Sequence, residues 1–120
     1  MSNSDFDRLL TAEQFALMLA NGERTAKGCE IDNRPVVKLF TPDASCTWLL
    51  TELDPDDPDI AFGLCDLGMG FPELGSVRIS ELAALRGKLG LGVERDLHFI
   101  ADRTLCEYAD IARKAGRVET

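Results

Sequence analysis

The residues most able to do chemistry are the acids of one short segment, Asp54-Pro-Asp-Asp-Pro-Asp59. Carboxylates suit hard cations, but an EF-hand loop starting at Asp54 would need a glycine at its sixth position and a glutamate at its twelfth. The chain has Asp59 and Cys65 there, so we predict no metal site and no cofactor. A looser divalent site, a solvated loop that aids solubility and a negative patch for a basic partner are the three interpretations that remain.

The negative charge of the chain is concentrated around this segment. The 120 residues carry a formal charge of −8. Residues 39–77 hold eight of the 21 acids and neither Lys nor Arg, which leaves 13 acids against all 13 Lys and Arg elsewhere. A phosphate-backbone binder needs a basic patch, so we expect no direct nucleic-acid partner.

A negative patch of this kind favours a basic protein as the partner. We predict that Asp54, Asp56, Asp57 and Asp59 contact it. Phe71 lies between glycine and proline in a loop and is the candidate hydrophobic anchor of the same surface, to which we also assign Glu73.

A second group of polar residues lies in strand-like segments and could line a pocket on the sheet: Glu52, Asp66, Arg95 and His98. Polar groups that face a pocket are expensive to desolvate unless they are used. Against a pocket, the predicted hairpin register places Glu52 and Asp66 on opposite faces, and Arg95 is expected to pair internally with one of them. His98, the only histidine, would need a nucleophile and an orienting group to act as a base.

Other sequence patterns argue against a zinc site, a dinucleotide site, disulfide bonds and a membrane span. A zinc site from the histidine and three cysteines has the right atom types but no known ligand spacing. Gly68-Met-Gly70 begins like a dinucleotide fingerprint, but Glu73 stands where the third glycine belongs. The four cysteines are far apart, so we expect reduced, mostly buried thiols. Since we find neither signal-peptide features nor an apolar run that could span a membrane, we expect a cytoplasmic protein.

Two capping boxes mark the helices that must position these residues. Thr11-Ala-Glu-Gln14 opens a helix with Asn21-Gly22 as its stop, and Thr104-Leu-Cys-Glu107 opens another that Gly116 closes. Ser80 can cap a short helix between them. Residues 1–10 are expected to be disordered.

Strand signals lie at residues 35–40, 47–53, 60–66, 77–79 and 94–99. Residues 54–59 are too polar and too rich in proline to be anything but a loop, so the second and third strands are predicted to form an antiparallel hairpin with an acidic tip. Pairing Leu53 with Ile60 puts Leu53 and Phe62 on one face and Trp48 and Glu52 on the other. The pattern predicts a single α+β domain: a mainly antiparallel sheet of four to five strands packed by two to three helices.

An ordered string of motifs resembles a bacterial family known only as a domain of unknown function (family 2958). The motifs are Phe40-Thr-Pro-Asp43, Thr47-Trp48, Glu52-Leu-Asp54, Phe62-Gly63, Glu73-Leu-Gly75, Glu81-Leu82, Leu85-Arg-Gly87, Leu91-Gly-Val-Glu-Arg-Asp96 and Phe99. The resemblance covers residues 35–111. It implies a small cytoplasmic protein of the kind often carried on plasmids and other mobile elements, and it brings no catalytic residues.

These observations favour one function and leave an alternative. We expect a non-enzymatic protein-binding module of a mobile element, whose acidic hairpin loop engages a basic protein, such as a nucleic-acid-handling or host-defence factor. The alternative is a small enzyme or ligand-binding domain with the charged pocket described above.

Overall fold

The predicted hairpin forms the centre of the structure. In the computed structural model, which describes residues 3–29 and 31–120, β2 (Thr47–Asp54) pairs antiparallel with β3 (Asp57–Asp66). Three further strands, β1 (Val37–Phe40), β4 (Glu73–Arg78) and β5 (Glu94–Arg95), complete an antiparallel sheet of order β4-β3-β2-β1-β5. The predicted α+β class and the predicted antiparallel sheet of four to five strands are confirmed, with five strands present.

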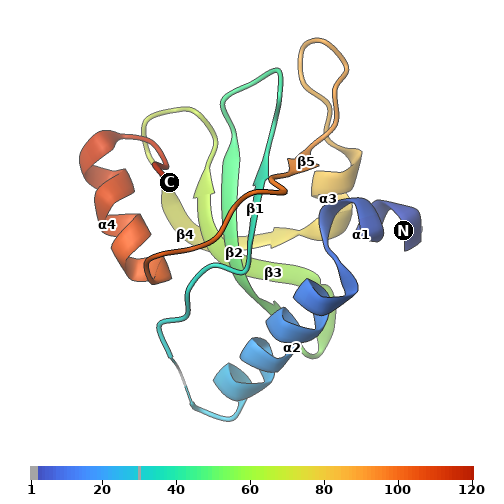
Figure 1. Ribbon diagram of the computed structural model, residues 1–120, viewed down its shortest axis with the longest axis vertical. Helices are drawn as coiled ribbons and strands as arrows, with labels where there is room; N and C mark the ends of the chain where they lie inside the picture. The colour runs from blue at the N-terminus through green and yellow to red at the C-terminus, as the bar shows by residue number, and fades with distance from the viewer. Residues whose placement is uncertain (1–2, 30) are drawn as a thin grey trace.

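Helices cover both faces of this sheet. The described residues form α1 (Asn3–Leu9), α2 (Ala12–Ala26), α3 (Ile79–Ala84) and α4 (Leu105–Ala115). In Figure 1, α4 lies at the left of the sheet and α1 and α3 lie at the right. One core cluster, which includes Trp48, Leu50, Leu53 and Ile79, faces α1, α2 and α3; a second, which includes Leu49, Leu64 and Tyr108, faces α4. Both faces of the central strands are therefore buried over much of their length.

Both capping boxes form as the sequence predicts. The Thr11 hydroxyl accepts from the Gln14 amide at 3.0 Å, and the Gln14 side chain accepts from the Thr11 amide at 2.9 Å. Thr104 and Glu107 do the same at the start of α4, which ends at Gly116 in the left-handed conformation. Local hydrogen bonding sets these ends, so the sequence alone predicts them.

The predicted end of α2 at Asn21-Gly22 is wrong, because the helix continues to Ala26. Both residues are buried against β2, and a Cβ on Gly22 would overlap the carbonyl oxygen of Leu53. Glycine in a helix costs about 1 kcal/mol relative to alanine, but here it allows the close approach of a helix to a strand. A residue pair that resembles a stop signal is therefore a packing contact.

Residues 1–10 are expected to be disordered, and from residue 3 onward the structure describes a helix there. Helix α1 forms there, and Leu9 and Leu10 are buried in the first core cluster. Arg8 fixes the helix by donating to the carbonyl of Val93 at 2.6 Å and to that of Ala83 at 2.9 Å. These contacts join segments more than 70 residues apart, which no local pattern reveals.

The last predicted strand, residues 94–99, shortens to Glu94–Arg95. The Asp96 amide donates to the carbonyl of Lys38 at 2.9 Å, after which the Asp96 carboxylate accepts from the His98 amide at 2.8 Å. This local turn directs the chain away from the sheet. His98 is consequently exposed in a loop and not part of a strand.

Candidate functional site

The acidic tip of the hairpin is a tight turn. Asp54 pairs with Asp57, so that only Pro55 and Asp56 lie between the strands. The Asp54 carboxylate accepts from the Asp56 amide at 2.9 Å. The six-residue loop predicted at 54–59 is wrong in length, because residues 57–59 belong to β3, although a second register shift leaves residues 58–60 without a partner on β2.

Two of the four acids in this segment are bonded to residues of other elements. Arg78 binds Asp57 at 3.1 Å and Asp59 at 3.4 Å, and Asp59 also accepts from the hydroxyl and the amide of Ser80 at 2.6 and 2.8 Å. Burial would raise the pKa of Asp59, but the hydrogen bonds from Ser80 and the Arg78 cation hold it below its ordinary value. Asp57 and Asp59 thus fasten the hairpin to β4 and α3.

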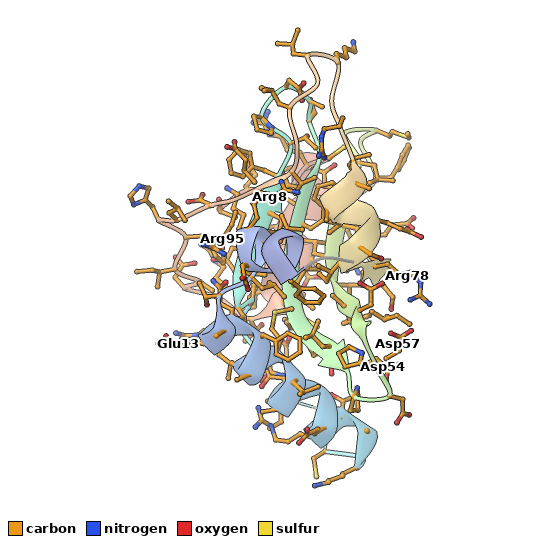
Figure 2. All side chains as sticks on the ribbon, turned by 90° about the vertical axis from the view of Figure 1, so that its right-hand side faces the viewer. Arg8, Glu13, Asp54, Asp57, Arg78 and Arg95 are labelled. Atoms are coloured by element: carbon orange, nitrogen blue, oxygen red, sulfur yellow. The ribbon has the colours of Figure 1, made fainter. Side chains whose placement is uncertain are left out.

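Asp54 and Asp56 remain as the exposed carboxylates of the turn. Figure 2 shows Asp54 and Asp57 beside Arg78 on one side of the molecule, with Glu13 and Arg95 on the other. The surface available to a partner at the hairpin tip is therefore smaller than the sequence suggested.

A groove of about 690 Å³ lies directly beside this hairpin. Its apolar lining comes mainly from the sheet and the hairpin turn: Ile60, Phe62, Leu74 and Pro55. The end of α2, the segment that follows it and the start of α4 provide further lining residues: Gly22, Thr25, Ala26, Ile31, Asp32, Asn33, Leu105 and Cys106. Helix α4 packs on Leu49, Leu64 and Leu74, and the groove extends from there towards the hairpin tip.

A β-bulge at Thr51 sets the faces of the residues that follow it in β2. Leu50 pairs with Gly63 as predicted, but the register then shifts, so that Glu52 pairs with Phe62 and Leu53 with Ala61. Glu52 and Leu53 both line the groove, but Leu53 is buried in the core cluster that faces α2, whereas Glu52 lies opposite Phe62. The predicted faces of Glu52 and Leu53 are therefore exchanged, since a bulge reverses the alternation of every residue beyond it.

Two hydrogen bonds hold the bulge. The Asn21 side chain donates to the carbonyl of Thr51 at 2.9 Å, and the Thr51 hydroxyl donates to the carbonyl of Phe62 at 3.3 Å. Strand β1 pairs with β2 only as far as Val37 and Leu50, and the Val36 amide just before it donates to the carbonyl of Leu50. Helix α2 thus takes over from β1 as the neighbour of β2 at the point where the bulge lies.

The start of α4 contributes an acid and a thiol to the groove. The Asp32 carboxylate accepts from the Cys106 amide at 3.1 Å. Burial would raise the pKa of Asp32, but its hydrogen bonds with Thr104 and Cys106 lower it below the ordinary value. Burial and then the nearby Asp32 raise the pKa of the Cys106 thiol, so this cysteine is not an activated nucleophile.

The charged residues that line the groove all have the same sign. Asp32, Glu52 and Asp54 are among its lining residues, whereas Lys, Arg and His do not occur in the described lining. Low-dielectric walls with charges of one sign raise the local concentration of counter-ions. This arrangement of an apolar floor and carboxylates is suited to a ligand that is both apolar and cationic.

The other residues predicted for the partner surface lie elsewhere. Phe71 is 80% exposed, but it follows the far end of β3, whose ten residues span about 33 Å. Glu73 is exposed at the start of β4, next to Phe71. The single surface predicted from the sequence is thus divided between the two ends of the sheet.

The alternative pocket of Glu52, Asp66, Arg95 and His98 does not assemble. Asp66 is buried and accepts from the amides of Gly68 and Val118 at 2.8 and 2.9 Å. Arg95 donates to the carbonyl of Asp7 in α1 at 3.2 Å, so the predicted pairing with Glu52 or Asp66 is wrong. Only Glu52 of the four lines the groove.

Three further properties bear on the predicted chemistry. The described residues contain no cluster of three His, Cys, Asp or Glu side chains arranged to hold a metal ion. All four cysteines are free, but Cys29 and Cys106 are exposed, contrary to the expectation that the thiols are mostly buried. Within the same described ranges, the helices are too short or too polar to cross a membrane.

Comparison with known proteins identifies a family for this chain but no individual curated protein or solved structure that matches it. The family model described as "Protein of unknown function (DUF2958)" matches residues 9–119, which is nearly the whole sequence and more than the 35–111 of the predicted resemblance. The chain therefore belongs to the DUF2958 family.

Proposed function

We propose that this protein is a non-enzymatic binding module that engages a basic segment of another protein at the hairpin end of its sheet. The binding surface consists of the exposed acids Asp54 and Asp56 together with the groove that contains Glu52. Phe71 and Glu73, at the opposite end, do not belong to it. In this proposal the module acts in the cytoplasm, is carried on a mobile element, and binds a nucleic-acid-handling or host-defence protein.

The observation that supports this proposal is the composition of the groove. It offers three carboxylates on an apolar floor and no cation among its described lining residues. A basic peptide segment supplies both the charge and the aliphatic surface that such a site lacks. Catalysis is not favoured, because the thiol in the groove has a raised pKa and the single histidine lies outside it.

The test is affinity capture from the native host with a charge-neutralised variant. A triple variant, Glu52→Gln, Asp54→Asn and Asp56→Asn, removes three charges from the proposed surface. The matched control removes three exposed charges elsewhere, with Asp7→Asn, Glu13→Gln and Glu94→Gln. We expect the wild type and the control to retain the same basic protein at low salt and to lose it at high salt, and the triple variant to lose it at both. Equal retention by the triple variant would refute the proposal.

A small cationic ligand is the second candidate, and the size of the groove favours it. About 690 Å³ falls within the range of small-molecule sites. The ligand-binding alternative is therefore proposed again with a different site, in which Glu52 is the only member of the four-residue pocket that contacts the ligand. Titration with spermidine separates the two candidates: a rise in the unfolding temperature that Glu52→Gln abolishes supports a small ligand, and no change at millimolar spermidine eliminates it.

A further inference from the structure

The bulge at Thr51 places Glu52 among the residues that line the groove, and no hydrogen bond or ion pair from the described residues involves its carboxylate. We propose that Glu52 and Phe62 together bind one arginine side chain of the basic partner, with the guanidinium stacked on the ring of Phe62 and hydrogen-bonded to the carboxylate of Glu52. This inference rests on the function proposed above and names the chemical group that the groove takes.

The sheet places the required groups in one row. Glu52 on β2 lies directly opposite Phe62 on β3, and Phe62 lies opposite Ser76 on β4. Directly opposed residues have Cβ atoms about 5 Å apart, so a cation over the ring of Phe62 is within reach of the Glu52 carboxylate. Ile60 provides a second apolar contact further along β3.

Arginine fits this row better than lysine does. Its guanidinium is planar, stacks on aromatic rings and forms two parallel hydrogen bonds with one carboxylate. A cation placed over an aromatic ring gains further attraction from the quadrupole of the ring. The exposed Ser76 at the open side of the row leaves space for the side chain to enter from solvent.

Arg78, a cation on strand β4, does not neutralise Glu52. Arg78 lies opposite Ile60 on β4, but its guanidinium binds Asp57 and Asp59. Asp57 and Asp59 therefore do more than fasten the hairpin. Because they bind the guanidinium of Arg78, the carboxylate of Glu52 is left available for a partner.

The bulge places Glu52 where a cation can bind it at low cost. In a regular strand Glu52 would share a face with Trp48 and Leu50, which are buried against the helices, and a carboxylate there would be desolvated. In the groove it stays partly exposed, so that binding an arginine removes little of its hydration. Bulges that redirect a side chain in this way are common next to functional sites.

The direct test compares two peptides that differ in one charged group. The probe is Ac-Gly-Val-Arg-Val-Gly-NH2, and its control carries citrulline, which has nearly the shape of arginine but no charge. We expect the arginine peptide to shift the backbone amide NMR signals of Glu52, Phe62 and Ser76, with at least tenfold weaker binding of the citrulline peptide. Glu52→Gln should remove this preference, while Asp7→Asn should leave it unchanged. Shifts outside the groove, equal affinity for both peptides, or no binding at about 10 mM would each overturn the inference.

The capture experiment then separates this inference from the proposed function. The single variant Glu52→Gln is compared with the double variant Asp54→Asn and Asp56→Asn. If the double variant loses the partner and Glu52→Gln retains it fully, the acidic tip binds the partner and the arginine site is refuted. If Glu52→Gln alone reduces retention at least tenfold, the arginine site is supported. If both variants retain the partner fully, the proposed function and the arginine site are both refuted.

Discussion

The side-chain amide of Asn21 in α2 donates a hydrogen bond of 2.9 Å to the main-chain carbonyl of Thr51, at the bulge of β2. Both residues are buried, at 3% exposure each. This contact satisfies a carbonyl that has no partner strand on that side. It also connects the helix to the point where the chain changes register, and so to the direction of the Glu52 side chain.

Replacing Asn21 with alanine should therefore destabilise the protein by about 2 kcal/mol, because a buried carbonyl loses its donor. Urea unfolding followed by circular dichroism measures this loss. Glu23→Ala, on the exposed side of the same helix, is the control and should change the free energy of unfolding by less than about 0.5 kcal/mol. If Asn21→Ala also lowers the free energy of unfolding by less than about 0.5 kcal/mol, Asn21 does not support the bulge.

Gly22→Ala tests the close approach of α2 to β2. At an exposed helix position this substitution would stabilise the protein by about 1 kcal/mol. Here the added methyl group would overlap the carbonyl oxygen of Leu53, so we expect a net loss of about 2 kcal/mol or more. The sign of the change in unfolding temperature shows whether the gain in helix propensity or the steric overlap is larger. An increase would mean that the helix and the strand are not in contact at Gly22.

The structure shows why some elements follow from the sequence and others do not. The capping boxes at Thr11 and Thr104 use hydrogen bonds between residues three apart, and the hairpin depends on neighbouring apolar runs. Such local signals predict where elements begin and how adjacent strands pair. The fold class could be inferred because these local elements account for most of the sheet.

The candidate site depends on contacts that no local pattern contains. The direction of Glu52 is set by a bulge that Asn21 supports from 30 residues away. The sequence of β2 is equally compatible with a regular strand, in which successive side chains alternate between faces. A prediction from the sequence therefore places Glu52 on the wrong face. Two features of the sequence are consistent with the bulge once it is known. Asn21 and Gly22 lie in the middle of an amphipathic helix, and the regular alternation of β2 would bury Glu52.

Asp59→Asn should make the stability of the protein less dependent on pH. The pKa of Asp59 is lowered in the folded state, so its contribution is present above the unfolded pKa and is lost as the pH falls through the folded value. We expect the variant to be about 1 kcal/mol less stable than the wild type at pH 7, and this difference to shrink towards pH 2. Urea unfolding at several pH values measures the difference.

Asp56→Asn is the matched control for this titration. Asp56 is exposed in the same turn, and its carboxylate has no bonded partner in the described structure. Its replacement should change the free energy of unfolding at pH 7 by less than about 0.5 kcal/mol. A difference at pH 7 that persists unchanged at pH 2 for Asp59→Asn would instead mean that the charge of Asp59 does not stabilise the contact with Ser80 and Arg78.

Alkylation of Cys106 reports on the electrostatics of the groove. Burial and the nearby Asp32 raise the pKa of this thiol, and only the thiolate reacts with iodoacetamide. In a Cys29→Ser background, Cys106 should react more slowly at pH 7.5 than a free cysteine peptide does. Asp32→Asn should lower the pKa of Cys106 and increase its rate several-fold, while Asp110→Asn, one turn along α4, should have a smaller effect because Asp110 acts on Cys106 only through its charge. Mass spectrometry of the Cys106 peptide over time gives the rates, and equal rates in the Asp32→Asn and parent proteins would contradict a negative potential from Asp32 at this edge of the groove.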